Sequence, residues 1–167
     1  MDSAVAEAAL EAEAPARVGN LAMRTHRFIR ELEHDRITRA IKEAEAKTSG
    51  QIRVFLQRGK FEEDALDRAQ KKFIQLGMHK TKERNAILIL VAPRAQKFAV
   101  VGDEGVHQKC GEKFWQELVE KMRLHFLREE FTDALVEGIE SAGQLLARYF
   151  PKTEPSANEL PDEIVEG

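Results

Sequence analysis

The fold of this chain is decided by its longest wholly apolar run, Ala86-Ile87-Leu88-Ile89-Leu90-Val91-Ala92. The run is too short for a buried helix and far shorter than the roughly 20 residues that a membrane-spanning helix needs. A short run of this kind, with no polar residue in alternation, is typical of a strand that is covered on both faces. We therefore predict the central and most buried strand of a sheet over residues 86–92.

The segments on either side of this run indicate two further strands. Residues 51–57 alternate polar and apolar side chains and include β-branched residues. A helical stripe over residues 66–76 separates them from residues 86–92, so the three segments form a β-α-β unit whose right-handed crossover makes the two strands parallel. Residues 97–101 follow after a short connection, which predicts an antiparallel hairpin with the central strand.

Amphipathic helices surround these strands. Apolar residues at helical spacing predict helices over about residues 34–47, 115–126 and 132–149, with Thr132 as the cap of the last one. The small residues of that last helix, Gly138 among them, predict close packing on a neighbour. The expected fold class is α/β, a three-layer α/β/α sandwich: a mixed sheet with a parallel β-α-β unit and an antiparallel hairpin carries helices on both faces.

The charge is distributed unevenly along the 167 residues, whose net charge is −3. Residues 1–16 contain four carboxylates and no Lys or Arg, and residues 151–167 contain five carboxylates against one lysine, which leaves residues 17–150 at +5. We expect three parts: a disordered or fraying acidic, alanine-rich segment at 1–20, one α/β domain at 21–150, and an acidic, proline-containing tail from residue 151 onward.

Composition and motifs exclude several classes of protein. One cysteine cannot close an intrachain disulfide, which excludes a disulfide-stapled secreted scaffold. The sequence has no signal-peptide pattern and no apolar stretch of membrane-spanning length. The basic excess is weak and no nucleic-acid-binding motif accompanies it, and the EF-hand, P-loop, H-E-x-x-H and G-x-S-x-G patterns are absent. We expect a cytoplasmic monomer with an unknown protein partner.

Oxygen-rich side chains should meet at one edge of the predicted sheet. A hairpin returns the end of its second strand to the start of its first, so the turn after residues 97–101 should lie beside the segment before residues 86–92. Carboxylate and amide oxygens suit hard cations such as calcium or magnesium. The alternative is a solvated turn, because Gly102-Asp103-Glu104-Gly105 is also a favourable turn sequence. The candidate ligands are Glu83, Asn85, Asp103 and Glu104, and the same edge receives the hydroxyl of Ser49.

Cysteine and histidine offer a second, weaker candidate. Cys110 follows His107 by three residues, which on a helical turn would place the thiol and the imidazole on one face, as a Cys–His pair or half of a zinc site requires. The alternative is a single, partly buried thiol. His26, His34 and His125 have no partner pattern, and no role is assigned to them.

Several local strings, in the same order, resemble the TPM-domain family, and in particular its small soluble bacterial branch. The resemblance spans about residues 33–167, and the family also includes a thylakoid lumen protein described as an acid phosphatase. The matching strings are Thr48–Val54, Leu76–Thr81, Asn85–Ile89, Lys97–Gly105, Phe131–Ile139 and Asn158–Glu163.

The resemblance implies an α/β/α sandwich with its functional residues at the same sheet edge. Members of the family bind divalent metal, calcium in particular. Carried over by position, the implied metal ligands are Asp103, Glu104, Glu83 and Asn85, and Asp103 is the implied ligand or base if the chain is a phosphatase. The chain departs from the family at one point: the usual Asp-Asn-Gly is here Arg84-Asn85-Ala86, which places a cation where relatives offer a ligand.

Three functions follow as hypotheses. The first is an accessory or interaction module that binds a divalent metal, calcium or magnesium. The second is a metal-assisted acid phosphatase, in which the metal would polarise a phosphoryl oxygen and activate water. The third is an adaptor that binds an acidic partner through the basic body of the chain.

Overall fold

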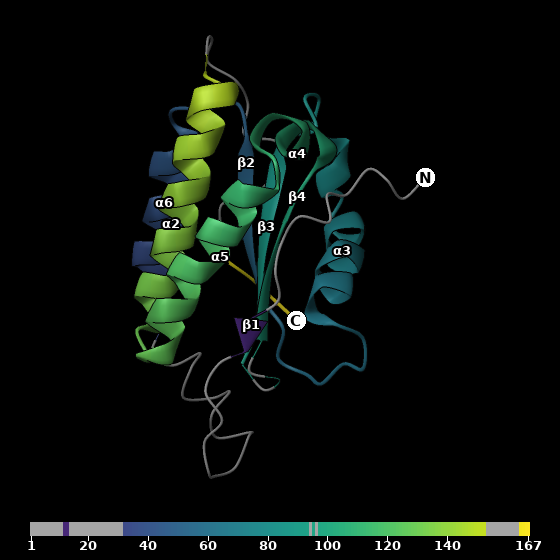
Figure 1. Cartoon of the computed structure of the whole chain (residues 1–167), viewed down its shortest axis with the longest axis vertical. Coiled ribbons are helices and arrows are strands. Elements are labelled where there is room, and N and C mark those ends of the chain that lie inside the picture. The colour runs from purple at the N-terminus through teal and green to yellow at the C-terminus, as the bar shows by residue number, and fades with distance from the viewer. Residues whose placement is uncertain (1–11, 14–31, 94, 96, 153–163) are drawn as a thin grey trace.

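The structure is a computed structural model, and it describes residues 12–13, 32–93, 95, 97–152 and 164–167. These residues form three layers, with a sheet between two helical layers (Figure 1). Helix α3 (Ala65–Gln75) covers one face of the sheet, which confirms one outer layer of the predicted α/β/α sandwich. Helices α2 (His34–Glu45), α5 (Glu112–Leu127) and α6 (Phe131–Tyr149) cover the other face and form the second outer layer.

Within the described residues, the sheet has five strands in the order β1-β4-β3-β2-β5. Strands β2 and β3 pair in parallel, with Ile52 opposite Ile87, and β3 and β4 pair antiparallel, with Ile87 opposite Gly102. Both predicted pairings are therefore confirmed, and β3 is the central strand and is buried along its whole length. The bounds are β1 (Ala12–Glu13), β2 (Gln51–Leu56), β3 (Ala86–Ala92), β4 (Lys97–Gly102) and β5 (Val165–Glu166).

The side chains of β3 alternate between two hydrophobic clusters. Ile87 and Ile89 belong to the cluster beneath α2, α5 and α6, whereas Leu88 and Leu90 belong to the cluster beneath α3, which includes Phe73. Successive residues of a strand point to opposite faces, so a strand with helices on both sides has to be apolar at every position. This requirement explains the uninterrupted apolar run.

The helix α6 packs closely on its neighbours, as its small residues predict. A Cβ added at Gly143 would lie 2.6 Å from the Cβ of Ala44 on α2, and one added at Gly138 would lie 2.6 Å from the sulfur of Met122 on α5. The prediction of Thr132 as the cap of this helix is wrong. Instead, the Thr132 hydroxyl accepts a hydrogen bond from the backbone N–H of Glu33 at 3.1 Å, which ties the start of α2 to the start of α6.

Residues that read as a simple turn after β4 begin a helix instead. Asp103 is the N-cap of α4 (Glu104–Cys110), and its carboxylate accepts from the backbone N–H of Glu104. Aspartate is a favoured N-cap, and an acidic first residue suits the positive end of the helix dipole, so both acids stabilise the start of the helix.

Parts of both chain ends join the sheet. Val165 and Glu166, from the acidic tail, form β5 beside β2, and Glu166 accepts from Arg58 at 2.6 Å. Ala12 and Glu13 form β1 beside β4; the rest of the segment at 1–20 that we expect to be disordered or fraying lies outside the described residues. In the part of the chain that the structure describes, no helix is both long and apolar enough to cross a membrane.

Candidate metal-binding edge

The start of β3 and the end of β4 meet at the predicted sheet edge. The backbone N–H of Asp103 donates to the carbonyl of Ala86 at 2.9 Å, and the N–H of Gln51 donates to the carbonyl of Asn85 at 3.4 Å. These bonds bring the loop before β3, the loop before β2 and the start of α4 together. Asp103 and Asn85 therefore lie on neighbouring segments at one sheet edge, as the hairpin predicts.

At this edge, the buried carboxylate of Asp103 forms an ion pair with the half-buried guanidinium of Arg84, and we call the two residues the buried pair after that carboxylate. Arg84 Nε donates to one carboxylate oxygen of Asp103 and Nη2 to the other, both at 2.8 Å. The side chain of Asp103 is 0% exposed, whereas that of Arg84 is 31% exposed. The hydrogen bond with Asp103 raises the pKa of Arg84 above its usual value, so the guanidinium stays charged. Both oxygens of Asp103 are thus engaged by a cation that belongs to the chain.

The backbone around the buried pair is tightly constrained. Arg84 has a φ of 53°, in the left-handed region that non-glycine residues seldom adopt. Gly105, in the first turn of α4, packs directly on the loop before β3: an added Cβ would lie 2.4 Å from the carbonyl oxygen of Glu83 and 2.5 Å from that of Arg84. Position 105 therefore has no room for a side chain. Because it is glycine, α4 can pack close enough to the loop for Asp103 to reach Arg84.

Ser49, Glu83 and Asn85 form a second group, which we call the edge cluster. The Ser49 hydroxyl donates to the Glu83 carboxylate, and Asn85 Nδ2 donates to Ser49 Oγ at 3.2 Å and to Glu83 Oε2 at 3.3 Å. Glu83 is exposed, whereas Asn85 is only 1% exposed. Asn85 Oδ1 is buried and has no hydrogen-bond partner among the described residues.

The four candidate ligands are therefore divided. Glu83 and Asn85 belong to the edge cluster, and Asp103 belongs to the buried pair. Glu104 begins α4, is half-buried and contributes its backbone N–H to Asp103. The carboxylate oxygens of Glu83, Asp103 and Glu104 do not all lie within 4.8 Å of one another. In the described part of the chain, a different group of three potential ligands meets this spacing.

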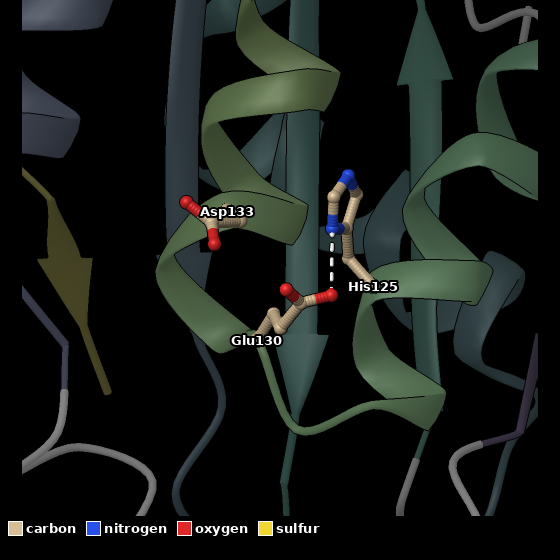
Figure 2. A group of neighbouring side chains, drawn as sticks. All are labelled: His125, Glu130 and Asp133. Atoms are coloured by element: carbon tan, nitrogen blue, oxygen red, sulfur yellow. Dashed lines mark hydrogen bonds and ion pairs between the residues drawn. The ribbon is translucent and has the colours of Figure 1, made fainter.

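That other group lies at the turn between α5 and α6 and consists of His125, Glu130 and Asp133; we call it the helix-turn cluster. Figure 2 shows the imidazole and the Glu130 carboxylate directed toward one another, with Asp133 on the first turn of α6. His125 Nδ1 lies 3.2 Å from Glu130 Oε1. Sequence reasoning assigned His125 no role, because its acidic neighbours lie across a helix break. The spacing His-x4-Glu-x2-Asp, which spans the helix break, is the sequence signal that could have indicated this group.

Cys110 is a partly buried thiol, as the simpler interpretation has it. Its Sγ lies 3.4 Å from the carbonyl oxygen of Gly111, and burial raises the pKa of the thiol to about 11. Nucleophilic catalysis and metal binding both require the thiolate, which is scarce at neutral pH when the pKa is this high. His107 and Cys110 are not part of a group of three potential ligands in the described residues.

Alkylation of Cys110 should accordingly be slow in the folded protein. The usual pKa of the thiol is 9.0, and a folded-state value of about 11 lowers the thiolate fraction at pH 8 by a factor of about 100. We expect iodoacetamide to react at least about tenfold more slowly with the native protein than with the urea-unfolded protein, as mass spectrometry would measure. The raised pKa also means that this group's contribution to stability is present below pH 9 and is lost as the pH rises through 11. Equal alkylation rates in the two states would contradict the shift.

Comparison with known proteins adds a family to this geometry. The family model of the TPM domain matches residues 24–145. Among solved structures, the chain is similar to the NMR structure of the BA42 protein from the psychrophilic bacterium Bizionia argentinensis, with 38% sequence identity and a TM-score of 0.75. The similarity covers 82% of this chain and 96% of the BA42 chain. No curated protein matches this chain.

Proposed function

This chain belongs to the TPM-domain family, and from that premise we propose that it is an accessory or interaction module that binds a divalent cation at the edge cluster. The ligands in this proposal are the Glu83 carboxylate, the Ser49 hydroxyl and the Asn85 side-chain carbonyl. The observation that carries the proposal is Asn85 Oδ1, a buried carbonyl oxygen without a hydrogen-bond partner among the described residues, on an amide that already contacts the other two side chains.

The Asn85 amide can serve the edge cluster in either of two orientations. As it lies, Nδ2 donates to Ser49 and Glu83. The nitrogen and oxygen of an amide group have nearly the same size and geometry. A half-turn about the Cβ–Cγ bond of Asn85 therefore exchanges the positions of Nδ2 and Oδ1. The half-turn gives up two hydrogen bonds and directs three oxygen donors to one side, which is the donor set that calcium prefers.

The buried pair does not fit a metal ion. An ion at Asp103 would have to displace the Arg84 guanidinium, which contacts both carboxylate oxygens, and the carboxylate has no exposed surface of its own. The guanidinium already neutralises the carboxylate through two charge-assisted hydrogen bonds, so an ion would have to break both of them to gain one buried ligand. We therefore leave Asp103 out of the proposed ligand set, although the family pattern implies it first.

Phosphatase activity has no comparable support. The role implied for Asp103, as metal ligand or base, requires an oxygen that a substrate, a water molecule or a metal can reach. The bidentate contact with Arg84 and the complete burial of the Asp103 side chain remove that access. We accordingly place the function of the edge cluster in binding rather than in hydrolysis.

Three ligands of which one is charged make a weak site with open positions. Calcium takes six to eight oxygen ligands, and it tolerates irregular geometry better than magnesium does. The remaining positions are available to water or to a carboxylate of a partner protein, which connects the ion with an interaction role. Calcium affinity is lower when fewer of the ligands are charged, and with one carboxylate we expect a dissociation constant on the order of 10⁻³ M.

A calcium titration followed by backbone amide NMR shifts tests this proposal. We expect the amides of residues 49–51 and 82–86 to shift in the full chain, and Glu83→Gln to weaken that response at least about tenfold because it removes the charged ligand. Glu43→Gln, at an exposed acid on α2, is the matched control and should titrate like the unmodified chain. No shift at millimolar calcium, or an unchanged titration in Glu83→Gln, would contradict the proposal.

A further inference from the structure

We infer that the helix-turn cluster, His125, Glu130 and Asp133, is a second metal site, and that it binds a transition-metal ion such as Zn²⁺. One imidazole nitrogen and two carboxylate oxygens lie within 4.8 Å of one another at the turn between α5 and α6 (Figure 2). This turn is at the opposite end of α6 from the edge cluster: Ser49 donates its backbone N–H to Phe150, directly after the last residue of α6. The 19 residues of α6 span about 28 Å, so the two sites are separate.

The backbone of the turn holds two of the three ligands together. The N–H of Glu130 donates to the carbonyl of His125 at 3.0 Å, and the N–H of Glu129 donates to the carbonyl of Phe126 at 3.0 Å. This is the Schellman arrangement that ends many helices, with Glu129 in the left-handed region at a φ of 63° in place of the usual glycine. Glu130 is thereby returned onto the last turn of α5, beside the imidazole of His125.

Glu130 does not use its carboxylate to cap α6, although it occupies the N-cap position. It makes no side-chain capping hydrogen bond, and its carboxylate lies against His125 Nδ1 instead. Asp133, three residues later, places a carboxylate oxygen within 4.8 Å of the ligand atoms of His125 and Glu130. Stabilisation of the helix dipole explains why acids stand in the first turn, but it does not require either of them to lie against an imidazole nitrogen.

The spacing suits a small metal ion. Three atoms within 4.8 Å of one another have a common centre at most about 2.8 Å from each, against bond lengths of about 2.0–2.2 Å for Zn²⁺ with nitrogen and carboxylate oxygen. The separation of 3.2 Å between His125 Nδ1 and Glu130 Oε1 is already close to the edge of a zinc tetrahedron, about 3.4 Å. Shifts of less than about 1 Å at the side-chain ends complete the approach.

The donor set and the surroundings select the class of metal. An imidazole with carboxylates favours Zn²⁺ and its transition-metal neighbours over calcium or magnesium, which prefer oxygen ligands alone. The three side chains are 31%, 39% and 39% exposed, so an ion can reach them and keep a water ligand. Arg36 donates to one oxygen of Asp133 at 2.6 Å and thereby orients that carboxylate, as hydrogen-bonded neighbours orient ligands in metalloproteins.

Titration calorimetry with Zn²⁺ on the full chain tests the inference. We expect one Zn²⁺ per chain, and at least about tenfold weaker binding in both His125→Ala and Glu130→Gln, because each removes a ligand. His34→Ala, at an exposed histidine on α2, and Cys110→Ser are the matched controls and should bind Zn²⁺ like the unmodified chain. Calcium should produce no heat that depends on His125.

A circular dichroism spectrum of each variant shows whether it is folded, and Glu130→Gln preserves the shape of the side chain. No Zn²⁺ binding by the unmodified chain, equal binding in His125→Ala and Glu130→Gln, or loss of binding in either control would overturn the inference and reduce the cluster to an ion pair at a helix junction. None of these outcomes bears on the calcium proposal, whose variants and metal are different.

Discussion

Arg84→Ala is expected to destabilise the protein by about 2–3 kcal/mol, because it leaves the Asp103 carboxylate buried without its counter-charge. This expected loss is smaller than for a fully buried pair, because Arg84 is 31% exposed and water can reach Asp103 once the Arg84 side chain is removed. Urea denaturation would measure the loss. Arg84→Lys should cost less, about 1 kcal/mol, because an ammonium keeps the charge but cannot donate to both oxygens in the same fork.

Arg58→Ala is the matched control for this prediction. Arg58 also pairs with one carboxylate, that of Glu166, but both side chains are at the surface, with 53% and 32% exposure. An exposed pair of this kind contributes between about 0 and 1 kcal/mol. Similar losses of unfolding free energy in Arg84→Ala and Arg58→Ala would show that the buried pair stabilises the fold no more than a surface ion pair does.

Removal of Arg84 should also open Asp103 to calcium. The Arg84→Ala variant carries an uncompensated carboxylate beside the edge cluster, and an ion that binds only the folded state stabilises it by mass action. We expect 10 mM calcium to raise the free energy of unfolding of Arg84→Ala by at least about 1 kcal/mol more than it raises that of the unmodified protein. Equal calcium-induced gains in unfolding free energy in the two proteins would mean that the Arg84 guanidinium does not occupy a position that a calcium ion can take.

Gly105→Ala is the second substitution with a large expected effect, and its sign is opposite to that of helix propensity. Alanine in a helix is ordinarily better than glycine by roughly 1 kcal/mol. Here the new Cβ would lie 2.4 and 2.5 Å from two backbone carbonyl oxygens, which cannot turn aside as a flexible side chain can. We expect a net destabilisation of roughly 2–4 kcal/mol in urea denaturation.

Gly59→Ala provides the control for Gly105→Ala. A Cβ at Gly59 would meet only the end of the Gln57 side chain, at 3.9 Å, so the change should stay within about 0.5 kcal/mol. If Gly105→Ala were as stable as the unmodified protein, α4 would not be pressed against the loop before β3, and the explanation given for the placement of Asp103 would fail.

The sheet could be predicted from sequence because hydrophobicity patterns report directly on burial. The uninterrupted apolar run of β3 marks a strand between two helical layers, and the hairpin with β4 then places Asp103 beside Asn85. The family resemblance added that Arg84 stands where relatives offer a ligand. The ion pair of Arg84 with Asp103 depends on the left-handed backbone at Arg84 and on a close contact that only glycine allows at position 105. Neither feature produces a periodic pattern in the sequence.

The helix-turn cluster could not be predicted for a related reason. Helical periodicity relates residues within one helix, whereas His125 lies in the last turn of α5 and Asp133 in the first turn of α6. Their approach depends on the turn at Glu129, where a non-glycine residue takes the conformation that glycine usually takes at a helix end. The sequence has no glycine there to mark the turn.

We propose that calcium binds at the edge cluster while the Arg84 guanidinium keeps both oxygens of Asp103 inaccessible to the ion. Side-chain ¹⁵N–¹H signals follow both residues in one calcium titration: the Nδ2 protons of Asn85 report on the edge cluster, and the Nε proton of Arg84 reports on the buried pair. We predict that the Asn85 signal shifts with calcium while the Arg84 signal stays in place. A shift of the Arg84 signal with an unmoved Asn85 signal would contradict the account, because the ion would then have displaced the guanidinium from Asp103.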